Sequence, residues 1–185
     1  MKVGCQLIIF GRDTVREDLA GVLATVAEAG YDGVETGDLS EDIGPEALRR
    51  ELTSRGLALV GTHAGFDAYR DDADRLADYT LQAGGRYLMC SGVGDRSRGL
   101  AAYEEAAAVM NEVGKKVARK GLVFCYHNHS WEFERFEGRP ALERLYELTD
   151  PEVVKLCVDT CWVYHGGEDP AEFIRRYRDR VAVLH

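Results

Sequence analysis

Short apolar runs alternate along the chain with longer stretches in which apolar and polar positions recur at helical spacing. The runs at residues 57–61, 86–90 and 122–126 each begin just after a glycine that follows such a stretch. A glycine just beyond a helix end fits a left-handed cap, so the pattern predicts a repeated order of helix, glycine and strand. Because the apolar runs are continuous, the strands are expected to be covered on both faces, as in a parallel sheet.

The amphipathic stretches predict the helices between these strands. Thr14 to Glu17 has the pattern of a capping box, and residues 101–118 place their larger apolar side chains on one side. Pro45 and Pro170 stand where a first helical turn tolerates proline. Seven strands are expected, at residues 3–10, 31–35, 57–61, 86–90, 122–126, 153–158 and 181–185. The alternation predicts an α/β fold with right-handed crossovers.

The number of strands bears on the type of α/β fold. A closed (β/α)8 barrel needs eight strands, and this chain reaches seven before it stops at His185, directly after an apolar run. We therefore favour a barrel truncated after strand seven over an open doubly wound sheet. No linker is visible, so residues 1–185 are expected to form a single domain that lacks strand eight. Unpaired edges at strands one and seven would favour a longer natural protein, or a second subunit or copy in a homo-oligomer.

Composition narrows the classes of partner. The chain has 185 residues, with 23 Lys and Arg against 32 Asp and Glu, for a net charge of -9. Nucleic-acid binding is mainly electrostatic, so this charge argues against it. No apolar run approaches the roughly 18 residues of a membrane span, and no signal peptide is visible. Five cysteines without a CxxC spacing are then expected to be reduced thiols in a cytoplasmic protein.

Polar side chains collect where the predicted strands end. Four of the five histidines are at such ends, and the set is Gln6, Glu35, His63, Ser91, His127, His129, Glu132, Asp159 and His185. In parallel α/β folds, ligands bind beyond the carboxyl ends of the strands. Converging imidazoles and carboxylates suit a divalent metal, which can polarise a carbonyl while a nearby side chain moves a proton. Glu35 could instead serve only as a salt-bridge partner, and Trp131 and Trp162 either line a sugar or belong to the core.

Five segments carry a family resemblance. They are Gly30 to Glu35, Thr62 to Gly65, Tyr126 to Phe133, Val158 to Trp162, and Val181 to His185. In their order, and above all in the Tyr-His-Asn-His run followed by Glu-Phe, they resemble the xylose isomerase-like TIM barrel superfamily, in its sugar phosphate isomerase/epimerase branch, which includes inosose dehydratase-like relatives. The resemblance spans seven of that family's eight strands.

The resemblance implies a metal site. Family members commonly bind one divalent ion (Mn, Co, Mg or Zn) through a carboxylate on strand five, an aspartate on strand six, a histidine on strand seven and a glutamate on strand eight. Asp159 and His185 match the second and third ligands. For strand five we propose Glu132, and His127 remains the alternative because many relatives have glutamate at its position. The strand-eight glutamate lies beyond the chain, which is therefore expected to bind metal weakly and turn over poorly.

Two hypotheses follow from these residues and the resemblance. The leading one is a metal-dependent isomerase, epimerase or dehydratase that acts on a keto-sugar, sugar phosphate or cyclitol through an enediolate. His63, His129 or Glu35 would move the proton. The substrate would contact His127, Trp131, Trp162 and Gln6. The alternative is a non-catalytic sugar-binding or assembly module with an incomplete site.

Overall fold

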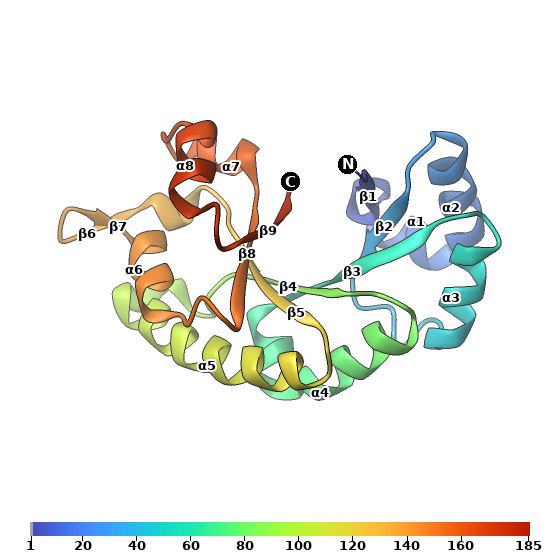
Figure 1. The fold of residues 1–185 in the computed structure, drawn as a ribbon, viewed down its shortest axis with the longest axis horizontal. Helices are drawn as coiled ribbons and strands as arrows, with labels where there is room; N and C mark the ends of the chain where they lie inside the picture. Colours follow the sequence, from blue (N-terminus) through green and yellow to red (C-terminus); the bar gives the residue numbers. More distant parts are fainter. Residues whose placement is uncertain (1) are drawn as a thin grey trace. The chain divides into compact units, whose positions relative to one another are not determined.

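The computed structural model describes residues 2–185, and the chain divides into two compact units (Figure 1). The first unit holds the chain up to Ala64 together with Asp74–Leu88, and the second holds Gly65–Ala73 and Met89–His185. The expectation of one domain over residues 1–185 stays a prediction.

Seven strands hydrogen-bond in the order β1-β2-β3-β4-β5-β8-β9. They are β1 (Gly4–Gln6), β2 (Gly33–Thr36), β3 (Ala58–Gly65), β4 (Tyr87–Ser91), β5 (Val123–His127), β8 (Val154–Val158) and β9 (Val181–Leu184). Within this sheet each strand lies beside the next one in the chain, whereas a doubly wound sheet reverses its strand order part-way. The strand order therefore confirms the α/β class and favours barrel-type winding.

In the first unit, β1 pairs in parallel with β2, and β2 with β3. The other elements of this unit are η1 (Leu7–Phe10), α1 (Arg12–Glu17), α2 (Leu19–Glu28), α3 (Pro45–Thr53) and most of α4 (Phe66–Gln82). Leu23, Val34 and Leu48 are fully buried in its core. The register pairs Gln6 with Glu35, so these two polar residues end neighbouring strands side by side.

In the second unit, β5 pairs in parallel with β8, and β8 with β9. Its helices and short strands are η2 (Arg96–Arg98), α5 (Leu100–Arg119), η3 (Trp131–Phe133), β6 (Arg135–Phe136), β7 (Arg139–Pro140), α6 (Ala141–Leu148), α7 (Thr160–His165) and α8 (Pro170–Tyr177). A Cβ on Gly114 would lie 2.5 Å from the Val153 oxygen, so α5 needs glycine there for its close approach. The last pairs in register are His127 with Cys157 and Val158 with Leu184.

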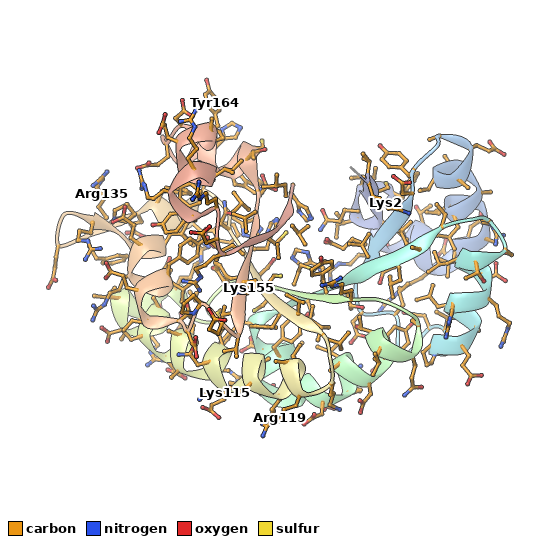
Figure 2. All side chains as sticks on the ribbon, viewed as in Figure 1. Lys2, Lys115, Arg119, Arg135, Lys155 and Tyr164 are labelled. Atoms are coloured by element: carbon orange, nitrogen blue, oxygen red, sulfur yellow. The ribbon has the colours of Figure 1, made fainter. Side chains whose placement is uncertain are left out.

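Several local predictions are confirmed. Residues 101–118 lie in α5, whose Lys115 and Arg119 project from the helix in Figure 2 while Ala106 and Met110 are buried. Pro45 and Pro170 begin α3 and α8. The helix-ending glycines 30, 56, 84 and 121 all have positive φ, between 72° and 88°. None of the five cysteines lies in a disulfide in the structure, and their reduced state in the cell stays a prediction.

Two local predictions are wrong. The first strand ends at Gln6, and the apolar residues after it form the 3-10 helix η1, in which Ile8 and Ile9 are exposed rather than covered by a neighbour. Thr14 is not a helix cap but lies inside α1, and the cap is Asp18, whose side chain accepts from the Gly21 N–H at 3.0 Å. Asp18 has φ −140° and ψ 57°, and this non-helical backbone separates α1 from α2.

The antiparallel β6–β7 hairpin has only two residues in each strand, too few to form an alternating pattern in the sequence.

Across residues 2–185, none of the helices combines the length and the apolar character needed to cross a bilayer.

Candidate functional site

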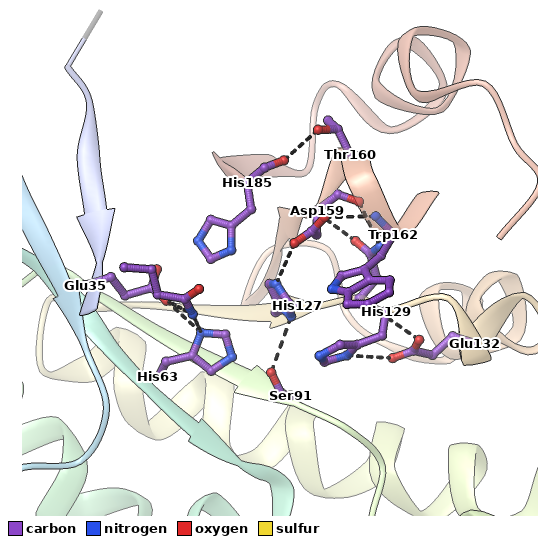
Figure 3. Close-up of polar contacts among 12 residues, drawn as sticks. Glu35, His63, Ser91, His127, His129, Glu132, Asp159, Thr160, Trp162 and His185 are labelled. Carbon is purple, nitrogen blue, oxygen red and sulfur yellow. Dashed lines mark hydrogen bonds and ion pairs between the residues drawn. The ribbon is translucent and has the colours of Figure 1, made fainter. Parts of the chain in front are cut away.

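Three polar side chains meet at the strand ends of the first unit, and we call Gln6, Glu35 and His63 the first-unit cluster. Figure 3 labels two of them, Glu35 and His63. Glu35 is buried, and its Oε1 lies 2.7 Å from His63 Nδ1. Gln6 Nε2 donates to the same oxygen at 2.9 Å and lies 3.2 Å from His63 Nδ1. This arrangement orients the imidazole by its Nδ1 atom, as in pairs that transfer protons.

Three potential metal ligands meet at the strand ends of the second unit, and we call His127, Asp159 and His185 the second-unit cluster. One ligand atom from each lies within 4.8 Å of the other two. His127 ends β5, Asp159 follows β8, and His185 follows β9, so three neighbouring parallel strands supply them. His127 Nε2 lies 3.4 Å from Asp159 Oδ2, and the rings of His127 and His185 have centroids 4.9 Å apart.

Asp159 is held by the helix that it begins. Its Oδ1 accepts from the Trp162 N–H at 2.9 Å, which makes it the N-cap of α7. Burial alone would raise the pKa of Asp159, but its contact with His127, the Trp162 N–H and the charge of His185 together lower it. The carboxylate is therefore ionised at neutral pH, as metal binding requires.

Hydrogen bonds to the backbone link the residues of the second-unit cluster to one another. The Asn128 side chain donates to Asp159 O at 3.2 Å and accepts from Asp159 N at 3.0 Å. Thr160 donates to His185 O through its N–H and through its hydroxyl, each at 2.8 Å. His185 N in turn donates to Val158 O at 2.9 Å. These bonds fix the spacing of the strand ends beyond the regular pairing.

Glu132, proposed from the sequence as the strand-five ligand, lies outside this group. It is fully buried, and its two carboxylate oxygens accept from the Tyr126 hydroxyl at 2.7 Å and the His129 N–H at 2.8 Å. Burial, together with the charge of Glu132, raises the pKa of Tyr126 well above its ordinary value, so that tyrosine remains a donor. The alternative residue, His127, takes the place beside Asp159 and His185.

Aromatic side chains adjoin the cluster within the second unit. The His129 ring stacks on Trp131, with centroids 3.8 Å apart, and meets the His127 ring edge-on at 4.8 Å. Trp162 lies 5.8 Å from His129 and is 37% exposed, and the Arg96 guanidinium is 4.5 Å from the centre of the Trp131 ring. Both tryptophans thus lie beside His129, where an apolar wall for a sugar ring is expected.

The second-unit cluster fits a divalent ion by its donors and their spacing. Two imidazoles and one carboxylate are a donor set typical of zinc, cobalt or manganese. Two ligands bound at about 2.1 Å to a tetrahedral ion lie about 3.4 Å apart, which is the separation of His127 Nε2 and Asp159 Oδ2. No cysteine joins this group among the residues that the structure describes.

Sequence reasoning assigned no role to three residues that the structure places at this cluster. Asn128 and Thr160 bond to the backbone of Asp159 and His185, and the hydroxyl of Ser91 lies 3.4 Å from His127 Nδ1. Asn128 and Thr160 each follow directly after a potential ligand, and this adjacency at the end of a buried strand was the available signal. Their partners are backbone atoms of other strands, which no local pattern reveals.

Comparison with known proteins gives a family match and curated relatives. A family model described as xylose isomerase-like TIM barrel matches residues 23–185. An inosose dehydratase from Geobacillus kaustophilus is 29% identical over 190 residues, which cover 89% of this chain and 60% of the relative. An inosose dehydratase from Lacticaseibacillus casei is 25% identical, with 85% of this chain and 59% of the relative covered. The chain thus spans about three-fifths of the length of these relatives.

Solved structures agree on the fold. A sugar phosphate isomerase/epimerase from Parabacteroides distasonis superposes with a TM-score of 0.88 at 21% identity, covering 100% of this chain and 74% of the other. An L-ribulose 3-epimerase superposes with a TM-score of 0.81 at 17% identity, covering 100% of this chain and 69% of the other. At these identities the likeness establishes the fold.

Proposed function

The chain belongs to the xylose isomerase-like TIM barrel family, and from that premise we propose that its protein is a metal-dependent isomerase, epimerase or dehydratase. The substrate is a keto-sugar, a sugar phosphate or a cyclitol. The observation that carries the proposal is the second-unit cluster, in which His127, Asp159 and His185 bring three ligand atoms within 4.8 Å of one another.

His127, Asp159 and His185 are the proposed ligands of one divalent ion. When bound, such an ion polarises the substrate carbonyl and stabilises the negative charge that develops on its oxygen. The carboxylate of Asp159 and the two imidazoles supply the donors. Trp131 and Trp162 are proposed to contact the apolar face of a sugar ring, because aromatic side chains offer large rigid surfaces for such contacts.

The remaining polar groups are proposed to move protons. His129, whose ring meets His127 edge-on, would take the proton from the carbon next to the substrate carbonyl, leaving an enediolate. Return of a proton to that carbon from the other face gives epimerisation, and return to the former carbonyl carbon gives isomerisation. Departure of a β-hydroxyl as water, with a proton from an acid, gives dehydration. Within the first unit, the Glu35–His63 pair is proposed as an acid–base pair, with Gln6 beside it as a polar substrate contact.

The relatives favour this class of reaction. Proteins named inosose dehydratase and L-ribulose 3-epimerase differ in outcome, and both reactions can begin with loss of a proton beside a carbonyl. The three proposed ligands all lie at strand ends within the described residues. The proposed first step, loss of a proton beside the carbonyl, is the same whichever product follows.

The test uses the natural full-length protein, loaded with Mn²⁺ or stripped by chelator, and a panel of keto-sugars, their phosphates and inososes in D₂O. We expect metal-dependent entry of solvent deuterium at the carbon next to the carbonyl, followed by NMR. An epimer or isomer as product identifies an isomerase, and a dehydrated enone or diketone identifies a lyase. No deuterium in any substrate, together with indifference to chelator, would contradict the proposal and favour the non-catalytic sugar-binding module.

A further inference from the structure

The proposed ligands lie where regular strand pairing stops. The β5–β8 ladder ends with the His127–Cys157 pair, and the β8–β9 ladder ends with Val158 and Leu184. Beyond these pairs the chain turns away into η3 and α7. The ligand atoms therefore need some other constraint if their separations are to be fixed before a metal arrives.

Asn128 supplies that constraint between β5 and β8. It is fully buried, and its amide makes a reciprocal pair of hydrogen bonds with the backbone N–H and C=O of Asp159. An asparagine side chain carries one donor group and one acceptor, so it can satisfy both backbone groups at once. Because Asn128 directly follows His127, this pair links the first ligand to the second.

Thr160 supplies the corresponding constraint between β8 and β9. Its hydroxyl donates to His185 O at 2.8 Å, and its own N–H donates to the same oxygen at 2.8 Å. Thr160 directly follows Asp159, so this bond links the second ligand to the third. The two linkages differ in one useful way: replacing the Thr160 side chain removes only one of two bonds, whereas replacing Asn128 removes both of its bonds.

We infer that Asn128 and Thr160 are positioning residues that hold His127, Asp159 and His185 at metal-binding distance by hydrogen bonds to the backbone of the neighbouring strand. The inference rests on the proposed metal centre. Neither residue belongs to the proposed ligand group, and their effect is to reduce the rearrangement that binding would otherwise require.

The experiment titrates the metal-free full-length protein with Co²⁺, whose visible absorption reports both affinity and coordination geometry. The variants are Asn128→Leu, Thr160→Val and Thr160→Ser. We expect Asn128→Leu to weaken Co²⁺ binding by about 10- to 100-fold, the range for residues that orient metal ligands. Thr160→Val should weaken it by about threefold because one of its two bonds remains. Thr160→Ser keeps the hydroxyl and should restore wild-type affinity and spectrum.

A matched control separates positioning from general stability. Thr149 is buried in the second unit, and its hydroxyl donates to Leu145 O and accepts from Arg180, away from the cluster. Thr149→Val should lower the melting temperature and leave the Co²⁺ spectrum unchanged. If Asn128→Leu does not fold, the two Thr160 variants still decide, because valine lacks the hydroxyl and serine keeps it.

The outcomes are distinguishable. Wild-type affinity and spectrum in the Asn128→Leu and Thr160→Val proteins would overturn the inference and leave the metal centre standing. Loss of Co²⁺ binding in Thr160→Ser equal to that in Thr160→Val would also overturn it, because the hydroxyl would then not be the cause. Failure of the wild-type protein to bind Co²⁺ would remove the proposed function and the inference together.

Discussion

The first-unit cluster and the second-unit cluster are both built at the ends of parallel strands, but they are held together differently. In the first, side chains bond directly to side chains: Glu35 Oε1 lies 2.7 Å from His63 Nδ1 and accepts from Gln6 at 2.9 Å. In the second, the side chains His127 and Asp159 approach only to 3.4 Å, and the closer bonds run to backbone atoms.

We interpret this difference as two proposed kinds of chemistry. A carboxylate in short contact with an imidazole orients its ring nitrogen, an arrangement typical of acid–base pairs. The His127 Nε2–Asp159 Oδ2 contact is a long hydrogen bond at 3.4 Å, and the same separation suits two neighbouring ligands of one tetrahedral ion. The two clusters therefore respond differently to loss of a carboxylate.

The largest expected effect is loss of metal binding in Asp159→Ala. This change removes the only carboxylate of the second-unit cluster and should weaken Mn²⁺ or Co²⁺ binding by at least about 100-fold. Isothermal titration calorimetry on the full-length protein measures it. Glu35→Gln is the matched variant in the first-unit cluster and should bind the ion with unchanged affinity. Equal losses of metal affinity in both variants would show that metal binding does not depend on the second-unit cluster alone.

The next effect concerns turnover. Glu35→Gln keeps the shape of the side chain and one carbonyl acceptor but removes the negative charge beside His63 Nδ1, which would otherwise stabilise the protonated imidazole. We expect the rate of deuterium exchange into substrate to fall by about 100-fold with little change in KM, as for loss of one acid–base group. Gln6→Ala removes the weaker contact and serves as control, with a loss below about tenfold. An unchanged exchange rate in Glu35→Gln would leave that carboxylate with a structural role.

Much of the fold and part of the site follow from local sequence. Continuous apolar runs after glycines locate most of the strands because burial on both faces demands them, and α5 follows from its apolar stripe. Asp159 and His185 are expected at strand ends, on the ligand side of a parallel sheet, and the structure places them there together; their role as metal ligands comes from the family resemblance and stays a prediction. In the first strand the same reasoning fails: Ile8 and Ile9 are apolar but exposed, and composition alone does not distinguish a 3-10 turn from a strand.

The strand-five ligand shows why the rest could not be predicted. Glu132 and His127 are both near the end of β5, and a carboxylate is the better match to the family pattern. The structure adds a tertiary observation: the Tyr126 hydroxyl and the His129 N–H donate to the Glu132 oxygens inside the core, which favours His127 while the ligand itself stays a prediction. Asn128 and Thr160 are equally hidden from a sequence pattern, because their partners come from other strands.

Glu132→Gln tests this assignment and should have a moderate effect. A glutamine retains one carbonyl acceptor, but its NH₂ group faces a donor that Glu132 formerly accepted from, so one buried donor loses its partner. We expect a loss of about 1–3 kcal/mol in the free energy of unfolding, measured by urea denaturation of the metal-free protein. Co²⁺ affinity should change by less than about threefold. A residue that binds the ion or orients one of its ligands would cause a larger loss, of about 10-fold or more. A loss approaching that of Asp159→Ala would return Glu132 to the ligand set.

The smallest expected effect concerns Asp38, a carboxylate of the first unit, and compares it with Asp159 of the second unit. Its Oδ2 lies 2.9 Å from Arg75 Nη2, and its Oδ1 accepts from Ser40. Burial alone would raise the pKa of Asp38, but the bonds from Arg75 and Ser40 outweigh it and hold the pKa below 3.8. A depressed pKa stabilises the folded state above the unfolded value, and this contribution is lost as the pH falls through the folded value.

Asp38→Asn should therefore lower the free energy of unfolding at pH 7 by no more than about 1 kcal/mol, since Arg75 is largely exposed and screened by solvent. The difference from wild type should shrink steadily as the pH falls below 3.8 and should be smaller in high salt. Urea denaturation of the metal-free protein at several pH values measures it. Arg75 is a permanent cation, so metal loading should leave this difference unchanged, whereas Asp159 should become harder to protonate when an ion is bound. A stability difference between Asp38→Asn and wild type that changes on metal loading would contradict the expectation that Asp38 is independent of the proposed metal site.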